Sequence, residues 1–419
     1  MPFKSSARGS YGPQGQKVIK GPLAPVWTTF SPGAVGTSAF TYTFVATDDS
    51  GDAPTYSVAS GSLPTGLTLN SSTGVLSGTA TVSGTYTYTL RATDVNGRTT
   101  DTTSISQVVT LSAPPGGDLY QTAGTYTWTA PTGVTSINVV AIGGGGSGST
   151  GNTGNAGAGG GLGWKNNITV VPGTGYTVVV GAGATGKPGQ PYQEGADGGV
   201  SYFINTSTVA GYGGTRGSLS PDSGVGGSCF APTGGGYAGD GGGNGGNGGY
   251  ECNNTSGPGG GGAGGYSGAG GAGAQSVNNG SGASGSGGGA GAGGNGGGGS
   301  CYDGGGGGGT GVYGQGANGS GGSNGGTGGY GGGGGSGGGG GETAGTGCYT
   351  FAGDGGAYGG GGGGTNDASS GGNNPRSGDG SRGAVRIIWG PSRSFPSTNV
   401  GLNYGVGTIS GATSEVTRA

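Results

Sequence analysis

Histidine is absent from this sequence. The side chains that remain as candidates for chemistry are four cysteines, 17 carboxylates and 20 tyrosines. Without histidine, a serine–histidine catalytic triad and most transition-metal sites are excluded. The cysteines are Cys229, Cys252, Cys301 and Cys348, which are separated by 23, 49 and 47 positions. Zinc and redox motifs need closely spaced pairs, so we expect a structural role, either as buried thiols or as disulfides.

The carboxylates indicate no catalytic pair. Glycoside hydrolysis needs two carboxyl groups that face each other across the scissile bond, whereas the acids here are scattered along the chain. Convergence would have to come from the fold, and the acids considered for it are Asp240, Glu251, Asp303, Glu342 and Asp354. Strings that mimic phosphate-binding loops follow from the composition, and no lysine stands in the Walker position. We therefore expect no enzymatic activity and no cofactor or metal.

Tyrosines recur through the glycine-rich half of the chain, and each offers a flat apolar ring and a hydroxyl. At a loop tip such a side chain suits contact with a sugar or a protein receptor. It can equally cover the ends of glycine strands and shield their amides from water. The candidate receptor contacts, with this structural role as the alternative, are Tyr237, Tyr250, Tyr266, Tyr302, Tyr313, Tyr330, Tyr349 and Tyr358.

The first 25 residues carry a local excess of positive charge with no acid among them. The candidate anchoring residues are Lys4, Arg8, Tyr11, Lys17 and Lys20. Binding to nucleic acid through phosphates needs more cations than these, and the net charge of the chain is -3. We expect this segment to dock on a neighbouring protein, and we expect no nucleic-acid partner.

Neither a leader sequence nor a membrane span is expected. The start, "MPFKSSARGS", lacks an apolar run of signal-peptide length, and no later run approaches the length of a span. These features predict a protein that is not exported by the usual route, so that an extracellular role would require another way out, such as cell lysis.

The pattern of short strands predicts an all-β chain. Residues 1–25 contain glycine and proline without amphipathic periodicity, and we expect an extended arm. Residues 26–113 alternate threonine, tyrosine and valine between turns, as in "AFTYTFVAT" and "GTYTYTLRATD", which predicts an antiparallel β-sandwich.

Within this segment, "LPTGLTLNSSTGVLSGTATVSGTYTYTLRATDVNG" over residues 63–97 resembles the repeat of the bacterial Ig-like, cadherin-like family. The resemblance implies an Ig-like sandwich that acts as a spacer. Relatives with tandem copies can bind calcium between domains. Only one copy is present here, so we expect Asp48, Asp49, Asp52 and Asp94 to be turn residues.

Residues 114–119 are expected to form a linker, followed by a glycine-rich domain over residues 120–390 and a tail over residues 391–419. Two apolar strands bracket the glycine tract, "SINVVAI" at its start and "AVRIIW" at its end. We expect Ala384–Trp389 to return and pair with Ile137–Ile142, which would close the domain.

Glycine accounts for 127 of the 419 residues, against an ordinary usage of about 7%. Glycine loses the most freedom on ordering, so disorder is the simple alternative. Spaced aromatics and the bracketing strands favour a folded domain. Without Cβ atoms, left-handed extended strands with three residues per turn can pack at backbone contact and satisfy one another's amides. We predict such a polyglycine-II sandwich, with turns at bulkier clusters that gather at its ends.

The stretch "GTYTWTAPTGVTSINVVAIGGGGSG", together with "GSRGAVRIIWG", resembles the glycine-rich domain of bacteriophage tail-fibre and virion proteins, especially those of marine and cyanobacterial phages. The resemblance spans about 270 residues, from Tyr120 to Gly390. It implies a virion protein assembled in the host cytoplasm and exposed on the particle, with a host-surface glycan or protein as its partner. A homo-oligomer, such as a trimer, is expected. The alternatives are a capsid decoration or head-fibre protein and an extracellular adhesin or filament subunit.

Overall fold

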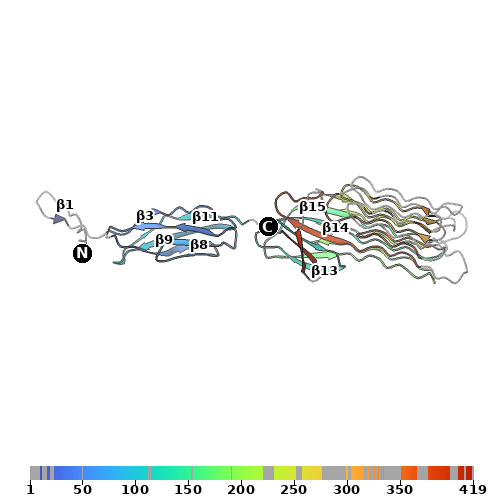
Figure 1. The fold of residues 1–419 in the computed structure, drawn as a ribbon, viewed down its shortest axis with the longest axis horizontal. Coiled ribbons are helices and arrows are strands. Elements are labelled where there is room, and N and C mark those ends of the chain that lie inside the picture. The colour runs from blue at the N-terminus through green and yellow to red at the C-terminus, as the bar shows by residue number, and fades with distance from the viewer. Residues whose placement is uncertain are drawn as a thin grey trace. The chain divides into compact units, whose positions relative to one another are not determined.

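In this computed structural model the chain forms two compact units (Figure 1). One comprises Met1–Ala113 with Pro131–Gly133, and the other comprises Pro114–Ala130 with Val134–Ala419. We call them the N-terminal unit and the glycine-rich unit. The residues that the structure describes are 10–11, 17–18, 23–49, 51–111, 113, 115–151, 154–189, 191–219, 231–251, 257–275, 299–300, 303–315, 319, 324–325, 328–329, 332, 334, 351–365, 376–396, 404–409 and 412–417.

All regular secondary structure in these residues is β, so the predicted all-β class is confirmed. In the N-terminal unit β9 is central to a four-stranded sheet, pairing with β6, β10 and β11, and β3 pairs with β5 while β8 lies between β4 and β7. The strands are β3 (Val26–Thr29), β4 (Phe40–Thr43), β5 (Val45–Thr47), β6 (Thr55–Gly61), β7 (Leu67–Leu69), β8 (Val75–Gly78), β9 (Gly84–Thr93), β10 (Thr99–Asp101) and β11 (Ile105–Val109).

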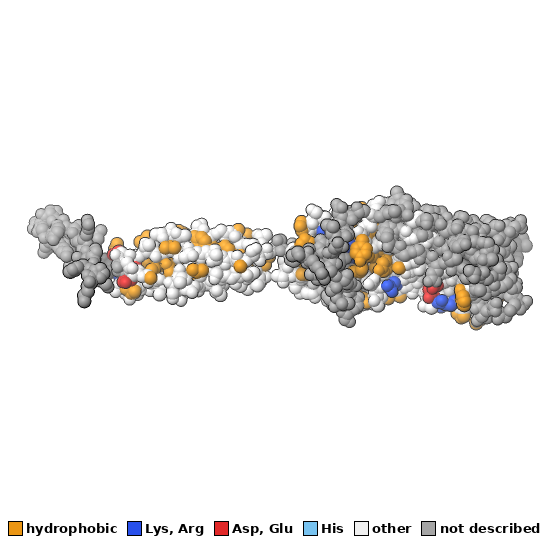
Figure 2. Space-filling model, viewed as in Figure 1, with side chains coloured by type: hydrophobic (Ala, Val, Ile, Leu, Met, Phe, Trp, Pro, Cys, Tyr) orange, Lys and Arg blue, Asp and Glu red, His pale blue; other side chains and the backbone are white. Residues whose placement is uncertain are grey.

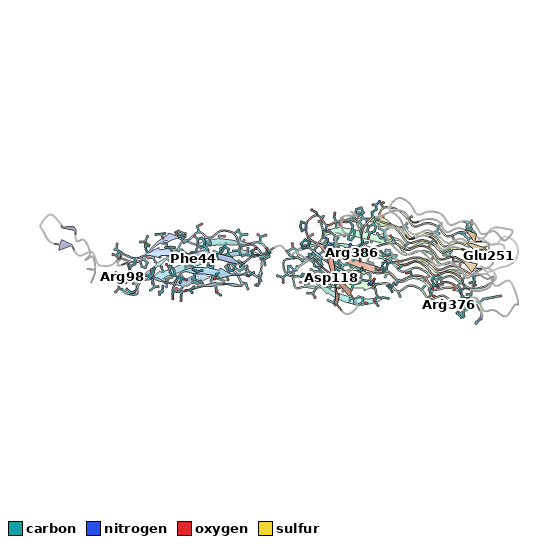
Figure 3. All side chains as sticks on the ribbon, in the orientation of Figure 1. Phe44, Arg98, Asp118, Glu251, Arg376 and Arg386 are labelled. Atoms are coloured by element: carbon teal, nitrogen blue, oxygen red, sulfur yellow. The ribbon has the colours of Figure 1, made fainter. Side chains whose placement is uncertain are left out.

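The core of this unit follows from the alternation in β9. Tyr88, Leu90 and Ala92 are buried, whereas the residues between them face outward, as a half-buried strand requires. Phe44 is fully buried and its ring lies 4.9 Å from that of Tyr42 in a T-shaped contact (Figure 3). Figure 2 shows that the described surface of this unit carries few charged groups and scattered apolar side chains.

Two glycines of the "LPTGL" and "LSGT" motifs are required where β7 meets β8. Gly66 has a φ of +93° and Gly78 a φ of +140°, both in the region that side chains disfavour. A Cβ on Gly66 would lie 2.2 Å from the carbonyl oxygen of Thr79, and one on Gly78 would lie 2.2 Å from that of Gly66. The close pairing of these strands therefore needs glycine at both positions.

Asp94 organises the turn between β9 and β10. Its carboxylate accepts hydrogen bonds from the backbone N–H groups of Asn96 and Arg98, each at 2.8 Å, and from Nε of Arg98 at 2.7 Å. Burial by itself would raise the pKa of the Asp94 carboxyl, but these hydrogen bonds and the Arg98 charge outweigh burial and hold that pKa below its ordinary value. Asp94 is a turn residue, as expected from the sequence.

Within residues 1–25 the structure places a small antiparallel pair, β1 (Ser10–Tyr11) with β2 (Lys17–Val18), in which Tyr11 is opposite Lys17. The expected extended arm therefore contains a hairpin. Lys4, Arg8 and Lys20 lie outside the described residues. At Leu23 the backbone N–H donates to the carboxylate of Asp49, which ties the start of the sandwich to the turn after β5.

The glycine-rich unit begins with two sheets. The seven-stranded sheet has the order β20-β15-β14-β25-β12-β27-β26, and the five-stranded sheet has the order β13-β16-β17-β18-β19. Two further pairs, β21 with β22 and β23 with β24, lie within the glycine tract. The strands are β12 (Gly116–Tyr120), β13 (Gly124–Thr129), β14 (Ser136–Ile142), β15 (Leu162–Thr169), β16 (Gly175–Val180), β17 (Ser201–Phe203), β18 (Val209–Gly211), β19 (Tyr237–Ala238), β20 (Gly241–Gly243), β21 (Gly299–Ser300), β22 (Asp303–Gly304), β23 (Asn324–Gly325), β24 (Gly328–Gly329), β25 (Ala384–Trp389), β26 (Tyr404–Ile409) and β27 (Ala412–Thr417).

The predicted closure of this unit is confirmed. β25 pairs antiparallel with β14, from Ile142 opposite Ala384 to Asn138 opposite Ile388. Every residue of β25 is buried, including Arg386, because the strand is central to the sheet. The first and last apolar strands of the tract are thus hydrogen-bonded neighbours.

The predicted linker over residues 114–119 is wrong. Gly116–Tyr120 forms β12, a buried strand between β25 and β27. The turn-like composition of "PPGGD" does not reveal this strand. Asp118 is buried in it, and the indole N–H of Trp128 donates to its Oδ2 at 2.8 Å.

The predicted tail over residues 391–419 is also corrected in part. β26 and β27 form an antiparallel hairpin, and β27 pairs with β12 along the edge of the chain's own sheet. The edge of β12 accounts for this pairing, since a buried strand needs hydrogen-bond partners on both sides.

We predict that Asp94→Asn lowers the melting temperature of the N-terminal unit. Because the folded-state pKa lies below the ordinary value of about 3.9, the stabilisation is complete above about pH 4 and is lost as pH falls through the folded pKa. The difference in melting temperature between wild type and variant should therefore shrink as the pH is lowered from 7 to 2. Thermal unfolding followed by circular dichroism would measure it.

The control is Asp101→Asn, which breaks the exposed pair with Arg91. Exposed pairs contribute little, so this change should have the smaller effect at neutral pH. Parallel melting curves for wild type and Asp94→Asn across the whole pH range would contradict the role given to Asp94.

Candidate functional site

The glycine tract forms an array of extended strands whose backbone groups bond in several directions. The strand at residues 156–161 illustrates it, because each successive N–H donates to a different neighbouring strand and the neighbours recur every third residue. The donations are Ala156 to Gly249, Gly157 to Gly362, Ala158 to Thr215, Gly159 to Gly246, Gly160 to Gly359 and Gly161 to Tyr212, at 2.7–3.0 Å. A period of three is the repeat of a polyproline-II-type helix.

The carbonyl groups of the same strand accept from further neighbours. Gly157 and Gly160 accept from Gly261 and Gly264, and Ala158 accepts from Gly146. Residue numbers rise together in the pair with 261–264 and in opposite senses in the pair with 246–249, so parallel and antiparallel neighbours are mixed. This hydrogen-bond pattern matches the polyglycine-II sandwich predicted from the sequence.

Space, and not backbone freedom, makes glycine necessary here. Gly157 and Gly159 do not have a positive φ. A Cβ on Gly157 would lie 2.0 Å from the carbonyl oxygen of Gly146, and one on Gly159 would lie 2.0 Å from that of Gly262. Ala156 and Ala158 lie in the same strand and are fully buried, so a methyl group fits at some positions and not at others.

The array has two ends. At the sheet end its strands continue into β14, β15 and β25, and Leu162, Tyr266 and Phe395 belong to one hydrophobic cluster there. At the opposite end, which we call the far end, polar side chains replace glycine. Asn155 donates to Ser218 at 3.2 Å and accepts from the backbone N–H of Glu251, and Figure 3 labels Glu251 and Arg376 at this end. The prediction that larger residues gather at the ends agrees with these placements.

Four of the predicted receptor-contact tyrosines lie at the sheet end. Tyr266 is buried, with its ring stacked on Phe395 at 5.8 Å and its hydroxyl donating to Gly311, so the prediction that it contacts a receptor is wrong. Tyr358 is half-buried and its hydroxyl donates to Gln121 at 2.7 Å. Both rings pack in or against the hydrophobic cluster at the sheet end. The positions of these tyrosines along the sequence could not reveal that role.

Tyr237 and Tyr313 are exposed but also belong to the sheet end. Tyr237 is in β19, opposite Gly211. Tyr313 is 52% exposed, and the guanidinium of buried Arg386 lies 4.6 Å from its ring centroid in a cation–π contact. Only Tyr250, which is half-buried next to Glu251, lies at the far end among the described candidates. The other predicted residues lie outside the described residues, namely Tyr302, Tyr330, Tyr349, Cys229, Cys252, Cys301 and Cys348.

The sequence reasoning missed two exposed aromatic rings at the far end. Phe351 is 61% exposed and Tyr192 is 41% exposed. The signal for Tyr192 was its loop, "GKPGQPYQEG", which is the first interruption of the tract by two prolines. Phe351 stands between two long glycine runs, at residues 337–341 and 359–364, and the other aromatic residues scattered through the tract gave no reason to single it out.

Charged groups accompany these rings. The guanidinium of Arg376 donates to Asp379, whose backbone N–H donates to Oδ1 of Asp354 at 2.7 Å. Burial raises the pKa of the Asp354 carboxyl, the hydrogen bond from Asp379 opposes the rise, and the charge of Asp379 adds to it. Asp240, by contrast, pairs with Lys165 at the sheet end, so the acids considered for hydrolysis do not all converge.

Among the described residues no cluster of three or more metal-ligating side chains is present. In the same residues no helix has the length and apolar character needed to cross a membrane.

Two family models match the chain. Residues 23–110 match the family described as "Putative Ig domain", and residues 121–328 match the family described as "Glycine-rich domain". No curated protein matches the chain. The chain therefore carries an Ig-like domain followed by a glycine-rich domain, an architecture compatible with a structural or adhesin-like protein. The second match stops at residue 328, whereas the array continues to the closing strand β25.

We predict that Gly159→Ala destabilises the glycine-rich unit by about 2 kcal/mol, because the new methyl group would have to displace the backbone of a neighbouring strand. Replacing several such glycines with valine should abolish folding of this unit. The matched control is Ala158→Gly in the same strand, which removes a methyl group without a clash. Chemical unfolding and amide hydrogen exchange would measure both, and unchanged exchange in Gly159→Ala would rule out the packed array.

Proposed function

We propose that this chain is a non-enzymatic bacteriophage virion protein of the tail-fibre or adhesin type. Its N-terminal segment would anchor it to other virion proteins, the Ig-like domain would act as a spacer, and the far end of the array would attach to the host surface. The observation that carries the proposal is the array itself, a hydrogen-bonded scaffold whose far end, opposite the sheets, carries exposed aromatic and charged side chains (Figure 3).

The physical argument concerns rigidity and display. The described strands of the array bond to neighbours in several directions, so the residues at the far end stand on a base that resists bending. Recognition residues on loops over a rigid scaffold lose little freedom on binding. The resemblance to phage glycine-rich domains supports a virion setting, with assembly in the host cytoplasm. Several copies on a particle would convert weak contacts into avid attachment, which supports a homo-oligomer.

The experiment that tests the function is competition for adsorption. Excess purified chain should reduce adsorption of phage particles that carry this protein to their host, in proportion to its concentration. Gold-labelled antibody against the glycine-rich unit should mark the tail on those particles. Labelling confined to the capsid, with no effect on adsorption, would favour a decoration protein instead.

We further predict that deletion of residues 1–22 leaves the two units folded but prevents incorporation into particles. The cut spares Leu23, whose N–H bonds to Asp49, and removes the basic residues from Lys4 to Lys20. Equal melting temperatures with and without the segment would verify the fold, and the protein content of purified particles would report incorporation. A truncated chain that is incorporated normally would disprove the anchoring role.

A further inference from the structure

Four side chains from neighbouring backbone segments form a surface feature at the far end, which we call the far-end strip. It consists of Phe351, Arg376, Lys187 and Tyr192. Phe351 and Arg376 are opposite each other in a parallel bridge, and the N–H of Ala352 donates to the carbonyl of Arg376 at 3.0 Å. These bonds place Phe351 and Arg376 side by side on neighbouring backbone segments.

The next segment continues the strip. The backbone N–H of Ser377 donates to the carbonyl oxygen of Lys187 at 3.0 Å, and the backbone N–H of Lys187 donates to Oγ of Ser377 at 2.8 Å. The loop that follows Lys187 is held by Thr150, whose hydroxyl donates to the carbonyl of Pro188 and accepts from Gln193. Tyr192 lies in this loop against Gly151, where an added Cβ would be 3.3 Å from Cγ of the tyrosine.

The two rings at the ends of the strip are largely open to solvent, with 61% of Phe351 and 41% of Tyr192 exposed. In Figure 2 an acidic, a basic and an apolar side chain lie next to one another at the place where Figure 3 labels Arg376. A single exposed ring is ordinary on a protein surface. Two such rings that share a surface with charged groups on neighbouring segments offer one ligand both flat apolar faces and polar atoms.

The polar groups near the rings are of both signs. Arg376 and Lys187 supply N–H donors, and Asp379 and Asp354 supply carboxylate acceptors beside Arg376. Near Tyr192, Arg216 pairs with Glu194 and Asp197. Lys187 forms no ion pair with any described residue. Such a mixture can donate to and accept from hydroxyl groups, but two cations beside two carboxylates give a polyanion little net attraction.

We propose that the far-end strip binds a neutral polysaccharide, an inference that rests on the proposed function and specifies the ligand of its attachment surface. The C–H groups on one face of a pyranose ring carry slight positive charge and stack on the negative face of an aromatic ring. Phe351 and Tyr192 each stack on one sugar unit, and the donors and acceptors between them bond its hydroxyls. A protein partner fits less well, because Lys187, Asp354 and Asp379 are of the residue types that are depleted at the centre of protein interfaces.

The experiment uses the full-length chain and biolayer interferometry with three immobilised polymers, the neutral polysaccharides dextran and mannan and the acidic polysaccharide alginate. We expect binding to at least one neutral polymer and none to alginate. Phe351→Ala and Tyr192→Ala should each weaken that binding about tenfold, as the loss of one stacked ring implies. Phe351→Tyr should retain it, because the ring remains.

The matched control is Tyr237→Ala, which removes a tyrosine of similar exposure, 39%, at the sheet end. This variant should bind as wild type does. A wild-type chain that binds neither neutral polymer, or that binds equally well without either ring, overturns the inference. Binding to alginate alone, lost in Lys187→Gln, also overturns it and identifies an acidic ligand. Failure of this inference can be distinguished from failure of the proposed function. A chain that binds none of the three polymers can still block phage adsorption through other groups at the far end.

Discussion

The structure depends on hydrogen bonds between backbones that approach one another without intervening side chains. In the strand at residues 156–161, successive N–H groups donate to three different neighbouring strands in turn, and the carbonyl groups accept hydrogen bonds from other strands. An interior built this way buries amides instead of apolar side chains, and its stability comes from the requirement that every buried amide be paired. Glycine's large loss of conformational entropy is the cost that this network of bonds offsets.

The same constraint explains why the glycine tract is enclosed by ordinary β-strands. An array of extended strands has no side chains to fix which strand lies next to which. β14 and β25 fix its beginning and its end as antiparallel neighbours, and the cluster around Tyr266 and Phe395 supplies a conventional hydrophobic base. Buried Arg386 is tolerated there because its guanidinium lies over Tyr313 and donates to the carbonyl of Val312.

The proposed function rests on the difference between the two ends of the array. The sheet end uses aromatic and apolar residues for packing, so they are committed to the fold. In the part of the far end that the structure describes, Phe351 and Tyr192 are exposed to solvent. A rigid array that exposes aromatic and charged side chains at one end is suited to binding a host surface. We therefore propose the far end, and not the tyrosines of the sheet end, as the binding surface.

The sequence by itself determined the β class, the Ig-like sandwich, the closure of the tract by Ala384–Trp389 and the polyglycine packing, because alternation, turn motifs and the absence of Cβ atoms are local properties. Only the tertiary structure decided that Gly116–Tyr120 is a central strand, since its burial depends on partners far along the chain. It also decided which rings are exposed. Tyr266 and Phe351 have similar glycine-rich surroundings in sequence, but one turn folds onto the sheets and the other lies at the opposite end of the array.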